Sequence, residues 1–241
     1  MKALILNSGM GSRMGALTKE HPKCMTNVTE ADTILSMQLK LLSRAGIREA
    51  VMTTGLFDGI LTEYCESLGL PLQFTFVKNP VYATTNYIYS IFLAREHLKD
   101  DILLMHGDLV FEESVLHDLL ASDTSCMAVS STLPLPEKDF KAVVRGGRVE
   151  KVGIEFFEDA VTAQPLYRLQ KKDWLVWLGR IASFCEAGEV KCYAENALNE
   201  VSGACAVYAL DVKNRLCNEI DTAEDLKAVS KRVEQLGAGS F

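Results

Sequence analysis

The sequence of 241 residues lacks several features that would assign it to a common class of proteins. No apolar run approaches the roughly 20 residues needed to cross a membrane, so we expect no membrane partner. A net charge of −7 without a basic stripe argues against a nucleic-acid surface. The seven scattered cysteines lack zinc-finger spacing, which favours reduced, mostly buried thiols. The N-terminus enters a predicted strand at residue 2, so we expect no signal peptide and a cytoplasmic protein.

A glycine loop follows directly after the first apolar run. Residues 3–6 are rich in branched side chains and predict a buried strand. The next residues, 7–12 (NSGMGS), would expose successive backbone N–H groups, which bind anions and phosphates above all. Arg13 and Lys23 add two cations. This combination predicts a site for a polyphosphate.

The loop does not match the two common nucleotide-binding motifs. A P-loop needs a Lys-Ser or Lys-Thr pair where this chain has Arg13 and Met14. The dinucleotide motif G-x-G-x-x-G would have its third glycine at Met14, and the nearby acid Asp32 precedes a helix-like run instead of ending a strand. A plain strand-turn-helix loop with a surface arginine remains the alternative, since short glycine motifs often occur by chance.

Strand-like and helix-like runs alternate along the chain, which indicates an α/β fold. The first half predicts strands at 3–6, 48–54, 72–78 and 102–105 and helices at 33–45, 57–68 and 87–98. The second half predicts a strand at 127–132, a hairpin at 140–152, helices at 171–187, 194–201 and 222–236, and a strand at 206–210. We expect one domain, residues 1–241, with a Rossmann-like mixed, mostly parallel sheet flanked by helices. A hairpin-and-helix lid would be inserted at roughly residues 134–204.

Two aspartates are placed to hold the divalent cation that a bound polyphosphate needs. Asp108 follows the strand at 102–105, at the edge where α/β sheets bind ligands, and Asp221 precedes the last helix. Magnesium binds one or two carboxylates together with phosphate oxygens, so we expect Mg²⁺ on these acids. The alternatives are a strand-end turn for Asp108 and a simple helix N-cap for Asp221.

Taken in order, these pieces resemble the cytidylyltransferases that act on phosphocholine and on 2-aminoethylphosphonate. The resemblance covers essentially the whole chain and is specific in its combination. One departure is Asn7-Ser8, where relatives usually have Ala-Ala or Ala-Gly, and it leaves the strictness of CTP choice open. The resemblance is carried by the glycine loop with Arg13 and Lys23, the stretch Asn79-Pro80-x-Tyr82…Asn86-x-x-Tyr89-Ser90, Asp108, and Glu219-Ile220-Asp221-Thr222.

The resemblance implies a nucleotidyltransferase fold and a role for each matching residue. It implies that Lys23, Arg13 and Asp108 are catalytic and that Asp108 and Asp221 bind Mg²⁺. The expected acceptor-binding residues are Tyr167, Tyr193, Glu195 and Asn196. The implied CTP-binding residues are Leu6, Asn7, Ser8, Gly9, Gly11, Ser12, Arg13, Lys23, Thr85, Asn86 and Ser90.

The implied reaction is an in-line attack by an acceptor phosphonate or phosphate oxygen on the α-phosphorus of CTP, which releases pyrophosphate. The acceptor is already an anion near neutral pH, so positioning and charge neutralisation suffice. Lys23 would stabilise the transferring phosphoryl group, and Arg13 the departing pyrophosphate. No general base is required, so we expect His106 to be structural.

Both candidate acceptors are small zwitterions with an ammonium on a two-carbon arm. A trimethylammonium prefers an aromatic cage, whereas a primary ammonium prefers carboxylates and carbonyls. The stretch 192–196 resembles a segment of phosphocholine enzymes that has a Trp in place of Ala194, while Glu195 remains as an acid. This favours 2-aminoethylphosphonate over phosphocholine. Trp174 and Trp177 could supply aromatic walls, but their spacing on an amphipathic helix is more typical of core residues.

Two other functions share parts of this pattern. A sugar-1-phosphate nucleotidyltransferase would have the same loop and both aspartates. A non-catalytic nucleotide-binding regulator would keep the loop and lose a metal acid, and the presence of both acids argues against it. A homodimer and a fusion to another enzyme domain both stay open.

Overall fold

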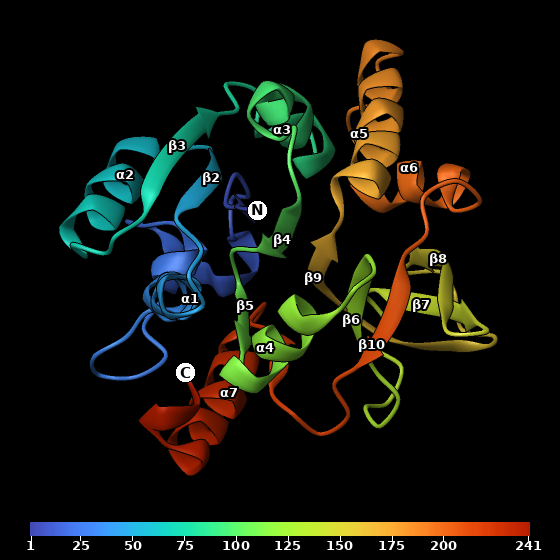
Figure 1. The fold of residues 1–241 in the computed structure, drawn as a ribbon. Helices are drawn as coiled ribbons and strands as arrows, with labels where there is room; N and C mark the ends of the chain where they lie inside the picture. The colour runs from blue at the N-terminus through green and yellow to red at the C-terminus, as the bar shows by residue number, and fades with distance from the viewer.

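A nine-stranded mixed sheet forms the centre of the molecule, with strand order β3-β2-β1-β4-β9-β6-β10-β8-β7 (Figure 1). The computed structural model describes residues 1–241, apart from the side chains of Ser12 and Ala238. The strands of this sheet are β1 (Lys2–Leu6), β2 (Glu49–Thr54), β3 (Gln73–Lys78), β4 (Ile102–His106), β6 (Cys126–Ser130), β7 (Lys141–Arg145), β8 (Arg148–Gly153), β9 (Ala160–Leu169) and β10 (Tyr208–Asp211).

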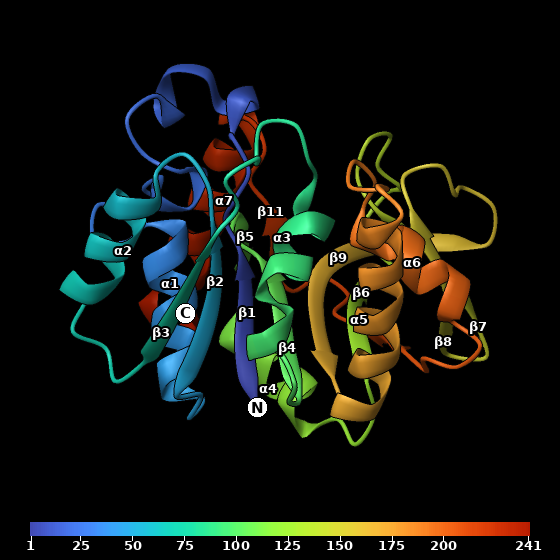
Figure 2. The ribbon, with the colours of Figure 1, turned by 90° about the horizontal axis from the view of Figure 1, so that it is seen from above.

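Helices cover both faces of this sheet because its central strands are apolar on both sides. Side chains of β1 alternate between the faces: Leu4 packs in the cluster that contains α3 and α5, and Ile5 in the cluster that contains α1 and α4. Figure 2 shows α3 and α5 beside each other over one face. The helices are α1 (Ile34–Arg44), α2 (Asp58–Ser67), α3 (Tyr87–Ala94), α4 (Glu113–Ala121), α5 (Lys171–Glu186), α6 (Ala194–Val201) and α7 (Ala223–Leu236).

The first four strands of the main sheet are parallel, as the alternation of strands and helices predicts. β1 pairs in parallel with β2 and β4, and β2 pairs in parallel with β3. Leu6, at the end of β1, is in register with Thr53 of β2 and His106 of β4. The carboxyl ends of these strands therefore meet at one edge, where the glycine loop begins.

A central strand in the second half was not predicted from the sequence. β9 lies between β4 and β6 and is antiparallel to both. Its Pro165 lacks a backbone N–H, which is typical of an edge strand or of no strand. The ladder to β6 shifts register between the pairs Met127–Tyr167 and Val129–Ala163, and Pro165 falls in that interval. The irregular pairing accommodates the proline inside the sheet.

The predicted hairpin at 140–152 is present as β7 and β8, but it is continuous with the main sheet. β7 pairs with β9 and β8 pairs with β10, so the hairpin forms the far end of the sheet. Segment 134–204 therefore contributes strands to the sheet as well as α5 and α6. The mixed α/β architecture that we expected is confirmed.

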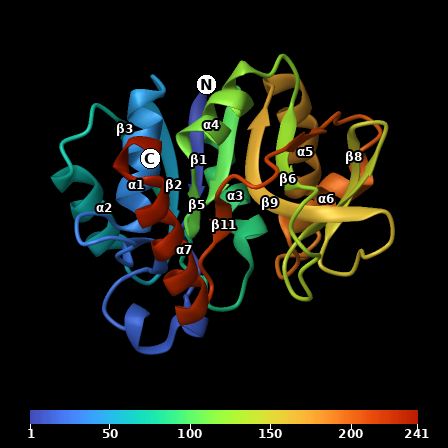
Figure 3. The ribbon, with the colours of Figure 1, turned by 90° about the horizontal axis from the view of Figure 1, so that it is seen from below.

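A second, two-stranded sheet places the last part of the chain beside β4. β5 (Leu109–Phe111) pairs with β11 (Cys217–Glu219), and α7 follows directly (Figure 3). Val229 and Val233 of α7 pack with Val110 of β5. The strands β5 and β11 were not predicted, because each has only three residues. The helix α4 was not predicted either. Within the described residues, no helix has the length and apolar character needed to cross a membrane.

Candidate active site

A pocket of about 380 Å³ lies at the carboxyl ends of β1 and β4. Its size is typical of a small-molecule site. The glycine loop and Lys23 form one part of its wall, and residues near β11 and Tyr193 form the opposite part. Twelve of the residues predicted for the site line it: Leu6, Asn7, Ser8, Gly9, Gly11, Arg13, Lys23, Thr85, Asn86, Asp108, Tyr193 and Asp221. The predicted side-chain role of Ser12 lies outside the described residues.

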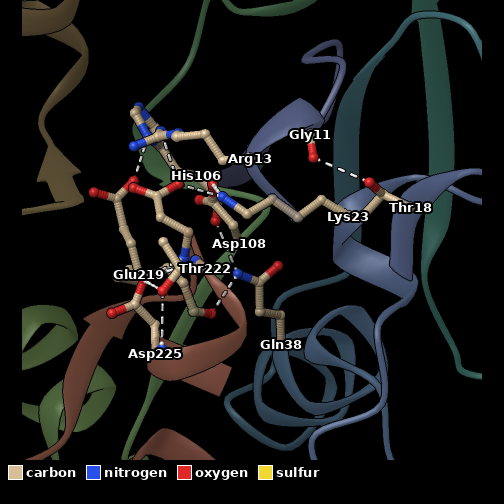
Figure 4. A network of polar contacts seen from close by, with 12 residues as sticks. Gly11, Arg13, Thr18, Lys23, Gln38, His106, Asp108, Glu219, Thr222 and Asp225 are labelled. Atoms are coloured by element: carbon tan, nitrogen blue, oxygen red, sulfur yellow. Dashed lines mark hydrogen bonds and ion pairs between the residues drawn. The ribbon is translucent and has the colours of Figure 1, made fainter. Parts of the chain in front are cut away.

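Lys23 joins the two predicted metal acids, Asp108 and Asp221. Figure 4 shows Lys23 reaching Asp108. Its ammonium donates to Asp108 Oδ2 at 2.6 Å and to Asp221 Oδ1 at 2.5 Å. Arg13 Nη2 lies 2.8 Å from the same oxygen of Asp221. Residues 108 and 221 thus meet at the glycine loop. The helix N-cap of α7 is Thr222, whose hydroxyl accepts from Asp225 N, so the N-cap alternative for Asp221 is wrong.

The charges in this cluster stabilise one another. Burial lowers the pKa of Lys23, but the charges of Asp108 and Asp221 outweigh it, so the pKa is raised above its ordinary value. Burial raises the pKa of Asp108, but Lys23 and His106 outweigh it, so that pKa is lowered. Asp108 is therefore ionised near neutral pH, and it shares the ammonium of Lys23 with Asp221.

The donor set fits a divalent cation of the magnesium type. Asp108 and Asp221 already direct one oxygen each at a common cation, the Lys23 ammonium. Asp108 Oδ1 is buried without a hydrogen-bond partner among the described residues, so a second acceptor is left over. Oxygen ligands from two carboxylates, completed by phosphate oxygens, are what Mg²⁺ prefers.

A third acid, Glu219, belongs to the site and was given no role from the sequence. Glu219 Oε1 pairs with His106 Nδ1 at 2.9 Å, and His106, Asp108 and Glu219 each offer a ligand atom within 4.8 Å of the others. Burial lowers the pKa of His106, but the bond and charge of Glu219 raise it to about 9. Burial, followed by the charge of Asp108, raises the pKa of Glu219 to about 7. Glu219 is the first residue of the Glu-Ile-Asp-Thr motif, so the sequence could have indicated it.

The glycine loop is held in place by close contacts with its neighbours. Gly11 has φ +62°, which favours glycine. A Cβ on Gly107 would lie 1.6 Å from Asn7 Oδ1, so the Asn7 amide packs directly on the α-carbon of Gly107. Ser90 does not line the pocket. Its hydroxyl lies 2.7 Å from that of Ser8 and supports the loop from behind.

Four rings gather at the inner end of the pocket. Tyr87 and His106 have ring centroids 4.9 Å apart, Phe140 and Tyr193 have centroids 5.0 Å apart, and Tyr87 and Tyr193 have centroids 6.0 Å apart. All four residues line the pocket. Tyr87 and Phe140 were not predicted for the site, because each fits the apolar pattern of its own element.

Three of the four residues predicted to bind the acceptor do not line the pocket and lie behind its aromatic wall. They are Tyr167, Glu195 and Asn196. Glu195 is 1% exposed and accepts from the hydroxyls of Tyr87 and of the fully buried Tyr167. Asn196 Oδ1 accepts from the backbone N–H of Tyr193 at the start of α6. Their contact with the pocket is thus indirect, through Tyr87 and Tyr193. Trp174 and Trp177 are fully buried, as their spacing predicts for core residues.

Comparison with known proteins finds nucleotidyltransferases among the relatives of this chain. A family model described as the MobA-like NTP transferase domain matches residues 3–137. The CMP-5'-(3-aminopropyl)phosphonate synthase of Streptomyces rubellomurinus is 35% identical over 135 residues, which are 56% of this chain and 21% of that protein. The choline-phosphate cytidylyltransferase of Streptococcus pneumoniae is 23% identical over 240 residues, which are 96% of this chain and 97% of that protein.

Solved structures show the same fold over nearly the whole chain. The CTP:phosphocholine cytidylyltransferase of Streptococcus pneumoniae superposes with a TM-score of 0.79 at 19% identity, covering 96% of this chain and 98% of that one. The inositol-1-phosphate CTP transferase of T. maritima also gives 0.79, at 22% identity, covering 100% and 97%. The matched segment spans only 21% of the Streptomyces protein and 48% of a CTP:phosphoglutamine cytidylyltransferase of Campylobacter jejuni.

Proposed function

Because the chain belongs to the MobA-like NTP transferase family, we propose that it transfers CMP from CTP to 2-aminoethylphosphonate and releases pyrophosphate. The observation that carries this proposal is the meeting of Lys23, Asp108 and Asp221 at the glycine loop. These three groups, brought together from distant parts of the chain, form a clamp for a metal-bound triphosphate. Cytidylyltransferase relatives that act on phosphate and phosphonate compounds support the choice of reaction.

In this proposal the residues of the chain bind and orient both substrates. The backbone amides of the glycine loop and the Arg13 guanidinium hold the β- and γ-phosphates. Lys23 moves its hydrogen bonds from the carboxylates to the α-phosphate, where charge develops. Asp108 and Asp221 would hold Mg²⁺, which supplies charge neutralisation of the phosphates. His106 is already engaged with Glu219, and an anionic acceptor needs no base, so His106 orients Glu219 instead of taking a proton.

The inner end of the pocket suits the ammonium of the acceptor. The Glu219 carboxyl pairs with His106 there, and Glu195 lies behind the ring of Tyr87 and accepts from its hydroxyl. Glu219 lines the pocket and its side chain is 18% exposed, so a primary ammonium can reach it. The name of the Streptomyces relative describes an aminoalkylphosphonate product, which supports the same acceptor class.

A second candidate acceptor is phosphocholine. The rings of Tyr87, His106, Phe140 and Tyr193 supply several walls of the kind that a trimethylammonium prefers. In either case we propose that segment 134–204 provides the acceptor side of a single domain, since Phe140 and Tyr193 both come from it.

The proposal is tested by measuring pyrophosphate release from CTP and Mg²⁺ with 2-aminoethylphosphonate, phosphocholine or glucose 1-phosphate. We expect the highest kcat/KM with 2-aminoethylphosphonate. An Asp108→Asn control should lower the rate about a hundredfold or more. A preference for phosphocholine would overturn the acceptor and leave the transferase activity standing. Turnover of glucose 1-phosphate alone would overturn both proposed acceptors, although CMP transfer from CTP would stand.

A further inference from the structure

Lys141, the first residue of β7, has a charged side chain that is completely buried outside the phosphate clamp. Its ammonium donates to the carbonyl oxygens of Pro136 at 2.6 Å and Asp139 at 3.2 Å. It also lies 4.1 Å from the ring centroid of Phe157. Lys141 therefore contacts two loops at once, one before β7 and one between β8 and β9.

Burial of an ammonium is costly unless polar groups surround it. Here the partners are backbone carbonyls and an aromatic face, so the side chain is stabilised only while both loops keep their conformation. The hydroxyl of Thr162 donates to the carbonyl of Pro134 at 3.0 Å and adds a second tie to the first loop. The loop before β7 is thereby tied to β7 by the Lys141 ammonium and to β9 by the Thr162 hydroxyl.

The two loops held by Lys141 build one wall of the pocket. The loop before β7 leads Lys138, Asp139 and Phe140 to the pocket, and the loop after β8 leads Ile154 there. Phe140 packs on Tyr193, with ring centroids 5.0 Å apart, at the end proposed for the acceptor ammonium. Displacement of this wall would alter the packing of Phe140 on Tyr193 at the proposed acceptor side.

We infer that Lys141 is a positioning residue that latches the acceptor-side wall of the pocket. Lys141 does not touch substrate and acts through residues 134–140 and Phe157. The expected effect on acceptor binding rests on the proposed function. The contacts of Lys141 with the two loops do not depend on it. The two parts are therefore tested by separate measurements.

The first measurement needs no substrate. Lys138 is exposed in the latched loop, so trypsin cleavage after Lys138 reports the opening of that loop, and mass spectrometry identifies the fragment 1–138. We expect Lys141→Met to accelerate this cleavage about tenfold. The matched control is Lys151→Met on β8, because Lys151 is exposed and lies farther from its ring, at 5.6 Å from the centroid of Phe156. The control should leave the rate unchanged.

The second measurement separates the KM values of the two substrates. Lys141→Met should raise the KM for 2-aminoethylphosphonate about tenfold, while kcat and the KM for CTP change less than about threefold. Phe157→Ala changes only a half-exposed ring and should shift both readouts in the same direction, which keeps the test available if Lys141→Met does not fold.

Unchanged cleavage after Lys138 in both variants would overturn the latch, whether or not the protein is active. Faster cleavage with unchanged acceptor KM, or an equal rise in both KM values, would overturn the positioning role. Faster cleavage in a protein that turns over neither acceptor would support the latch and refute the proposed function instead.

Discussion

Lys23 separates two carboxylates that would otherwise repel each other, so its removal should affect stability and metal binding in opposite directions. In Lys23→Met, Asp108 and Asp221 lose the ammonium that they share. Arg13 cannot replace it, because the Arg13 side chain is 63% exposed and reaches only Asp221. The site becomes a pair of uncompensated acids that should bind Mg²⁺ more tightly.

The size of the effect follows from the burial of the cluster. The side chains of Lys23, Asp108 and Asp221 are 12%, 21% and 12% exposed. Removing one partner of such a pair costs about 3 kcal/mol, the low end for buried pairs. In a chain of this length that loss lowers the unfolding midpoint by about 9 °C. Free Mg²⁺ at one hundred times its dissociation constant restores about 2.7 kcal/mol.

The assay is calorimetric unfolding of the wild type, Lys23→Met and Arg13→Met, each in EDTA and in excess Mg²⁺. We expect Lys23→Met to unfold well below the wild type in EDTA and to regain most of the difference in Mg²⁺. Arg13→Met should shift by less than about 3 °C, since its ion pair is largely exposed. CMP transfer should fall about a hundredfold in Lys23→Met even with Mg²⁺ present.

Two results would refute this reasoning. One is a Lys23→Met protein that unfolds at the wild-type midpoint in EDTA. The other is an equal Mg²⁺ stabilisation of the wild type and Lys23→Met, which would show that the ammonium and the metal do not share the same carboxylates.

Three further predictions concern neighbouring residues. Gly107→Ala should displace the Asn7 amide and impair both stability and CTP binding, and Asn7→Ala in the same chain should restore stability, because the three heavy atoms nearest to the added Cβ all belong to the Asn7 amide; failure of the double variant to recover contradicts this contact. Thr222→Ala should cost about 1 kcal/mol in urea unfolding with normal turnover, whereas Asp221→Asn should abolish turnover. His106 has a folded pKa of about 9, above its ordinary 6.5, so its stabilisation is complete below pH 6.5 and is lost as pH rises to 9; the free energy of unfolding measured across this window in EDTA should fall by about 3 kcal/mol, and a flat profile would contradict this.

The parallel half of the fold could be predicted because its signals are local. The strands β1, β2 and β4 are short, mostly apolar runs, β3 alternates apolar and polar residues, and the helices between them have an apolar face. β9 could not be predicted, because Pro165 conflicts with a central strand and only the irregular ladder to β6 resolves the conflict. β5 and β11 are too short for a periodic pattern, and their pairing joins residues more than one hundred positions apart.

The phosphate side of the site could be predicted better than the acceptor side. The glycine loop, Lys23 and Asp108 could be recognised from their positions after predicted strands, and all three line the pocket. At the acceptor side, Glu195 is an acid near Tyr193 in sequence, but hydrogen bonds from two tyrosines hold it behind the wall. Tyr87 and Phe140 resemble ordinary apolar residues, so only the tertiary structure reveals that they face the pocket.

The order of residues around Lys23 has a consequence for the protein during its synthesis. A growing chain presents Lys23 and Asp108 early, but Asp221 and Glu219 leave the ribosome only after nearly all other described parts. The small sheet that carries Glu219 closes on β5 at that same late moment. A chain truncated before residue 217 would lack Asp221 of the clamp, and Met14 beside the glycine loop would lose the cluster that it shares with Ile220 and Val229. Translation of residues 219–221 therefore completes the set of acids in the proposed clamp.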